Sequence, residues 1–116
     1  MRFMMLLRLD PSQAPEGPST ELMDEMGKLI EEMTRAGVLL DTGGFRPLEE
    51  STRIRLSGGK QTVLDGPFAE AKEVIGGYVL VQAKSKDEAA GWASRFLAIH
   101  GDGWELEAEI RQVEEP

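Results

Sequence analysis

Residues 65–81 read DGPFAEAKEVIGGYVLV, and this stretch decides the fold because a turn, a charged segment and an apolar strand follow one another in it. The ring of Pro67 pushes Gly66 out of the helical region, and the Asp-Gly pair before it favours a turn. Residues 68–73 are helix formers that can make one or two turns. Residues 76–83 carry apolar side chains on both sides of an extended segment, which predicts a central strand covered on both faces.

Four ionisable side chains lie close together in this stretch: Asp65, Glu70, Lys72 and Glu73. A connection fixed on a rigid sheet can hold such charges at set positions facing a ligand. The same charges also suit a solvated turn. The residues alone leave both interpretations open.

The segments on either side alternate between strand and helix periodicity. A Pro- and Gly-rich loop is expected over residues 10–18, which can neither continue a sheet nor hold a helix. Ser19 or Thr20 can cap the first helix, and Ser85 opens a capping box for the second. The elements predicted from the pattern are strands over 1–9, 38–44 and 105–112, helices from about 20 to 36 and from 86 to before 100, and a hairpin over 52–64 with its turn at 57–60.

This order is the split βαβ pattern of a ferredoxin-like α+β sandwich with an inserted β-hairpin. Two helices can cover only one face of the sheet. The first and third strands of the main sheet nevertheless look apolar on both sides, so a second surface must cover the other face. A symmetric homodimer with the two sheets face to face meets this requirement with one self-complementary interface.

Composition limits the classes of function. The 116 residues suit a single domain over residues 1–116. A net charge of −8, from 13 basic and 21 acidic residues, argues against nucleic acid and anionic membranes as partners. The absence of cysteine rules out disulfides and cysteine-ligated zinc. No apolar run is long enough to span a membrane. We therefore expect a soluble cytoplasmic protein, with no cofactor and no metal site.

Two further sets of residues are candidates for function. Arg53 and Arg55 share one face of the predicted hairpin, where they form either a solvated face or a clamp for an anion. His100 is the only histidine and has the intrinsic pKa of a general base, but only Asp102 lies near it in the sequence as an orienting partner.

The residue order of the 65–81 stretch resembles the signature of the DGPF branch of the YCII-related proteins, a family of small bacterial proteins. The resemblance extends over nearly the whole chain and includes the Gly76-Gly77-Tyr78 step. It implies a dimeric α+β barrel with a pocket between the sheet and the surrounding loops. A related branch carries a histidine and aspartate dyad, but the first helix here has no histidine and places Met26 at that position. The dyad is therefore not carried over to this chain.

The resemblance leads to two hypotheses of different classes. In the first, the dimer binds a small polar or aromatic metabolite and has lyase- or isomerase-type acid-base chemistry. Asp65 and Glu70 handle protons, Arg53 or Lys72 holds an anionic group, and Phe68, Glu73 and Tyr78 complete the site. In the second, the protein is a non-catalytic regulatory or protein-interaction module, linked to an alternative sigma factor, and the signature braces the fold.

Overall fold

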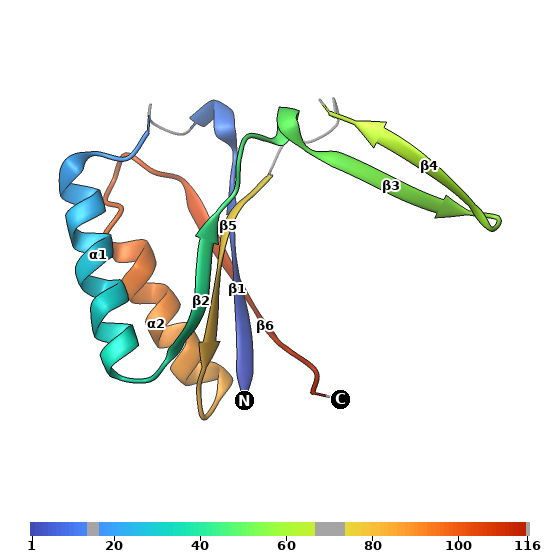
Figure 1. Cartoon of the computed structure of the whole chain (residues 1–116). Helices are drawn as coiled ribbons and strands as arrows, with labels where there is room; N and C mark the ends of the chain where they lie inside the picture. Colours follow the sequence, from blue (N-terminus) through green and yellow to red (C-terminus); the bar gives the residue numbers. More distant parts are fainter. Residues whose placement is uncertain (14–16, 67–73, 116) are drawn as a thin grey trace.

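The computed structural model describes residues 1–13, 17–66 and 74–115. Its main sheet has four antiparallel strands in the order β2-β5-β1-β6. Both helices lie on one face of this sheet (Figure 1). This is the ferredoxin-like α+β fold that the sequence pattern predicts. The elements of this layer are β1 (Arg2–Leu9), α1 (Thr20–Arg35), β2 (Leu39–Gly44), β5 (Val74–Gln82), α2 (Lys86–Ala98) and β6 (Leu106–Gln112).

The two strands predicted to be central, β1 and β5, are the two inner strands of the sheet. Their register pairs Met5 with Val79 and Phe3 with Val81. These side chains point toward the helices, where they form the core. β5 begins at Val74, two residues before its predicted start, because its first residues pair with the end of β1. The core consists of buried side chains from the sheet and both helices: Phe3, Met5, Leu29, Met33, Val38, Val79, Val81, Ala83, Ala89, Ala93 and Phe96.

Both helices begin at the predicted capping residues. The Ser19 hydroxyl accepts a hydrogen bond from the amide of Leu22, and that of Ser85 accepts one from the amide of Glu88, both at 3.1 Å. These bonds satisfy donors that the first turn of a helix leaves unpaired. Neither helix in the described part of the chain has the length and apolar character that a membrane span requires.

The loop predicted over residues 10–18 contains a short 3-10 helix, η1 (Pro11–Gln13), so the prediction that this segment holds no helix is wrong. Asp10 explains the turn, because its Oδ1 accepts hydrogen bonds from the amide of Ser12 at 2.9 Å and from its hydroxyl at 2.7 Å. Pro11 then occupies the first helical position, which its fixed φ suits. A proline that prevents a long helix therefore starts a short one.

The face of the sheet away from the helices carries a second set of apolar side chains, which we call the open face. Met4 pairs with Leu80 and Leu6 with Tyr78, and all four are half-buried. The edge strand β6 places Glu109 beside them, directly opposite Leu6 in the register. Glu109 also forms an ion pair with Arg8 at 3.0 Å. The open face is therefore apolar at its centre and charged along one edge, and no described element of the chain covers its centre.

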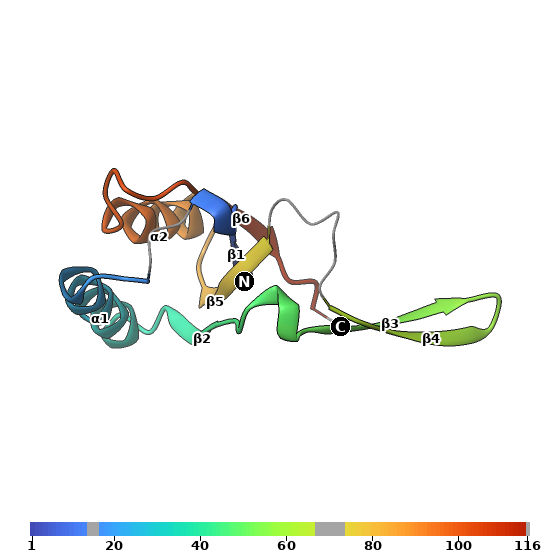
Figure 2. The same cartoon turned by 90° about the horizontal axis from the view of Figure 1, so that it is seen from above.

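The inserted hairpin is a separate two-stranded sheet made of β3 (Thr52–Ser57) and β4 (Lys60–Asp65). We call residues 52–65 the arm. Its turn has positive φ at both central residues, +57° at Gly58 and +78° at Gly59, which glycine adopts without strain. The arm projects from the main sheet on the side opposite the helices (Figures 1 and 2). The predicted hairpin is thus confirmed, and it stands clear of the layer that contains the core.

Candidate functional site

A cavity of about 400 Å³ lies at the end of the main sheet, where β1 stops, β2 leaves the sheet and β5 begins. The chain between β2 and the arm, including the 3-10 helix η2 (Leu48–Glu50), forms one side of it. Its walls are mainly apolar, and two charged residues, Arg46 and Glu49, lie among them. The described residues that line the cavity are Leu9, Pro11, Phe45, Arg46, Pro47, Leu48, Glu49, Val74, Ile75 and Gly76.

The described residues on either side of 67–73, within the signature stretch, adjoin this cavity. Val74, which follows residues 67–73, is part of the wall. Gly66, which precedes them, donates its amide to the carbonyl of Ser51 at 2.9 Å. A Cβ on Gly66 would lie only 2.8 Å from the carbonyl oxygen of Leu48, so glycine is required for this close approach. Gly66 and Val74 therefore both lie at the edge of the cavity.

Tyr78 connects the open face to the cavity. Its hydroxyl donates a hydrogen bond to Oδ2 of Asp41 at 2.9 Å, and its ring stacks on Phe45 with 5.6 Å between centroids and 28° between planes. Gly43 lies beneath the ring, where a Cβ would come within 3.0 Å of Tyr78 Cε1. The small residue on β2 thus lets the tyrosine lie across the strand and brace the cavity residue Phe45.

The hydrogen bond to Asp41, followed by partial desolvation and by the negative charge of Asp41, raises the pKa of Tyr78 above its ordinary value of 10.0. The folded chain binds this proton more tightly than the unfolded chain does. The interaction therefore stabilises the fold below the ordinary pKa, and this stabilisation is lost as the pH rises through the raised pKa.

We expect a spectroscopic titration to detect this shift directly, because Tyr78 is the only tyrosine in the chain. The tyrosinate absorbance near 295 nm should rise at a higher pH in the native protein than in the protein unfolded in urea. Asp41→Ala should bring the native midpoint back toward the unfolded one, since it removes both the acceptor and the charge. Equal midpoints in the native wild type and in Asp41→Ala would contradict the contact.

The other predicted site residues in the described part of the chain belong to the arm. The Asp65 carboxylate accepts a hydrogen bond from the Thr52 hydroxyl at 2.9 Å, across the base of the arm. Arg53 pairs with Leu64 and so faces the opposite side from Asp65. The described residues that line the cavity include neither of these two, nor Tyr78. The remaining predicted residues, Phe68, Glu70, Lys72 and Glu73, lie outside the described residues.

Sequence reasoning missed the wall between β2 and the arm. The sequence predicts no site residue among residues 46–50, yet Arg46, Leu48 and Glu49 line the cavity. Phe45 was the available signal, because a large aromatic residue directly follows two glycines at the end of a strand. Its side chain is 55% exposed. Arg46 also forms an ion pair with Glu50 at 3.0 Å, so its cation is held at the outer rim.

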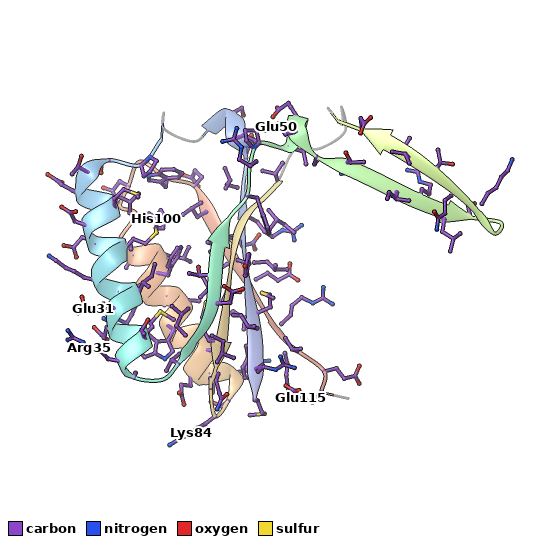
Figure 3. The ribbon with its side chains drawn as sticks, in the orientation of Figure 1. Glu31, Arg35, Glu50, Lys84, His100 and Glu115 are labelled. Atoms are coloured by element: carbon purple, nitrogen blue, oxygen red, sulfur yellow. The ribbon has the colours of Figure 1, made fainter. Side chains whose placement is uncertain are left out.

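His100 lies on the helical side of the sheet, away from Glu50 and the arm (Figure 3). Its Nδ1 is 2.9 Å from the carbonyl oxygen of Phe96, one turn back in α2. Its ring also contacts those of Phe96 and Trp104. These contacts indicate that His100 closes the end of α2 rather than serving the cavity. In the described ranges, no group of three histidine, aspartate or glutamate side chains is placed to hold a metal ion.

Comparison with known proteins identifies the family of the chain. The family model of the YCII-related domain matches residues 1–106. A curated protein of Rhizobium meliloti (strain 1021), the uncharacterized protein R00369, is 33% identical over 72 residues. The match covers 62% of this chain and 58% of that protein, so the chain spans less than two thirds of the relative's length. Since the family model covers residues 1–106 of the 116, the chain belongs to the YCII-related family.

Proposed function

We propose that this protein is a homodimer that binds a small polar or aromatic metabolite in the cavity at the end of its main sheet. The observation that carries the proposal is the position of the cavity, which is bordered by Gly66 and Val74, the described residues on either side of 67–73 in the signature stretch. We also assign the chain to the DGPF branch of its family, on the residues of that stretch, and regard residues 1–116 as one domain.

The size and lining of the cavity suit a small ligand. Binding sites for small molecules usually enclose roughly 300–1,000 Å³ and combine apolar walls with a few polar groups. Phe45 offers the face of an aromatic ring, and its stacking on Tyr78 limits how far it can move. Among the described residues of the lining, Arg46 and Glu49 supply the charged groups for a polar substituent. A flat metabolite with one anionic or hydrogen-bonding group satisfies these walls best.

The open face supports the homodimer. Met4, Leu6 and Leu80 are only half-buried, although they lie at the centre of the sheet. A second copy that packs its own open face against these residues removes the apolar surface from water. The same face-to-face packing would place a second open face beside Tyr78 and enclose the ligand further.

Acid-base chemistry of the lyase or isomerase type is the catalytic part of the proposal. Asp65 and Glu70 are the proposed proton-handling residues, and Arg53 or Lys72 the proposed holders of an anionic group. Asp65 directly precedes Gly66, whose backbone packs against the carbonyls of Leu48 and Glu49 at the cavity. Asp65 is therefore adjacent in sequence to a residue at the edge of the cavity, and a general acid or base must lie within hydrogen-bond reach of the ligand, directly or through one water.

Native mass spectrometry of the untreated protein, followed by thermal-shift screening of small aromatic and anionic metabolites, tests the proposal. We expect a dimer, and at least one compound that raises the unfolding temperature of the wild type. Phe45→Ala should abolish that shift. Met23→Ala should retain it, because Met23 is equally exposed at 56% but lies on α1.

Each result has a defined meaning. A shift that survives Phe45→Ala would place the ligand elsewhere and overturn the assignment of the cavity. A screen without hits, on a protein that captures a specific partner, would favour the regulatory module instead. Once a ligand is known, Asp65→Asn and Glu70→Gln should leave binding intact and abolish any turnover. Unchanged turnover would remove both residues from the chemistry.

A further inference from the structure

The arm exposes apolar side chains on one of its two faces. Ile54, Leu56 and Val63 are 66%, 69% and 63% exposed. The register places Ile54 directly opposite Val63, and Leu56 follows on the same face of β3. These three side chains therefore form a continuous apolar strip along the arm, which we call the arm strip.

The arm strip is not explained by the stability of the arm itself. A two-stranded hairpin is at best marginally stable in water when no third layer packs on it. Contiguous exposed apolar side chains on a soluble protein mark a surface that meets another molecule. The opposite face of the arm carries Arg53, Arg55 and Lys60. The arm strip and the basic side chains thus lie on opposite faces, with Leu64 also on the basic face and with Gln61 and Asp65 flanking the strip on its own face.

The direction of the arm indicates what covers the strip. The arm projects on the side of the main sheet opposite the helices, which is the side of the open face (Figures 1 and 2). Any molecule seated on the open face therefore lies next to the arm. In the proposed dimer, that molecule is the second copy of the chain.

Charge favours the same occupant. The arm contains three basic residues and one carboxylate, whereas the whole chain has a net charge of −8. The rest of the chain is therefore strongly acidic, and the basic arm is attracted to the body of another copy. An acidic body is thus the partner that the charge of the arm complements.

We infer that the arm of each copy packs the arm strip against the body of the second copy. This second copy is the one that covers the open face of the first. The inference rests on the proposed homodimer and extends it, because the sheet interface alone would leave the arm in water. In a two-fold dimer the contact occurs twice, so one substitution removes two copies of it.

Neighbouring substitutions in β4 test the inference with the dimer dissociation constant as the readout. Val63→Asp places a carboxylate in the arm strip and should weaken the dimer about tenfold or more, since a buried valine contributes about 1.5 kcal/mol or more. Thr62→Asp makes the same charge change one residue away, on the opposite face. It should change the constant less than about threefold, as expected for an exposed site. Equal effects of the two substitutions would overturn the inference.

A crosslinking experiment tests the contact without relying on the stability of the arm. The chain has no cysteine, so Leu56→Cys gives a single attachment point for a photoreactive thiol reagent. Mixed normal and 15N-labelled protein should yield crosslinked peptides that join one isotopic form to the other. Crosslinks confined to one copy would show that the arm folds back on its own body and would overturn the inference.

The outcomes also separate this inference from the proposed homodimer. A monomeric wild type at micromolar concentration would remove both. A wild-type dimer that Val63→Asp does not weaken, and that gives no crosslink between copies, would keep the homodimer and reject the arm contact. A weakened dimer together with crosslinks between copies supports both.

Discussion

Phe3→Ala is expected to lower the free energy of unfolding by about 3–5 kcal/mol, the usual cost of removing a buried aromatic ring from a core. Phe3 is 1% exposed and lies on the central strand β1, where its register partner is Val81, which is fully buried. The lost ring leaves a void between the sheet and both helices that rigid neighbours cannot fill. Chemical denaturation at one fixed protein concentration measures the effect.

Phe45→Ala is the matched control for this prediction. It makes the same chemical change at a phenylalanine that is 55% exposed, so it should cost less than about 1 kcal/mol. If the two substitutions destabilised the protein equally, Phe45 would carry packing that the described contacts do not explain. A small effect at Phe3 would contradict the core itself.

Gly77→Ala is expected to cost about 1–3 kcal/mol, because a methyl group at this position overpacks the sheet. The added Cβ would lie 2.8 Å from the carbonyl oxygen of Gly43 and 3.4 Å from the Cα of Gly44. Both neighbours are backbone of β2, so no flexible side chain can move aside. β2 must shift from β5, which also disturbs the support that Tyr78 gives to Phe45.

Gly91→Ala is expected to have the opposite effect on the stability of the protein. Gly91 lies within α2, and a Cβ there meets nothing within 4 Å. The substitution should stabilise the protein by about 1 kcal/mol, since alanine is the better helix former. Differential scanning calorimetry on both variants measures these two changes in stability. A destabilised Gly91→Ala or an unaffected Gly77→Ala would contradict the close packing of β2 on β5.

The fold was predictable because the spacing of apolar residues along each segment indicates which of its faces are buried. Met5 and Leu6 on β1 are apolar in succession, which identifies an inner strand, and β1 and β5 are indeed the inner pair. Ser19 and Ser85 mark the starts of the helices through their hydroxyls. The sequence pattern does not predict η1, because Pro11 only indicates that no long helix forms, whereas the short turn depends on the hydrogen bonds that Asp10 accepts from Ser12.

The site was less predictable, because its walls come from segments far apart in the chain. Leu9, Phe45 and Ile75 line one cavity, yet only the pairing of β2 and β1 with β5 brings them together. The charged residues of the signature stretch are dense in the sequence, which favours them as site candidates. The described lining of the cavity consists of apolar residues and of Arg46 and Glu49, whose position at the cavity depends on tertiary contacts. Asp65 was predicted as a site residue, and its observed partner is Thr52.

The place of the arm in the chain has a consequence for how such proteins diversify. β2 and β5 are neighbours in the sheet, with Gly44 beside Gly77, and the arm and the first part of the signature stretch lie between them in sequence. Lengthening a connection of this kind is cheap, since each doubling costs only about 0.6 kcal/mol in closure entropy. Insertions and deletions there can remodel the wall of the cavity and the arm while the sheet and helices stay unchanged. Evolution can thus alter these surfaces in one connection without having to find a new fold.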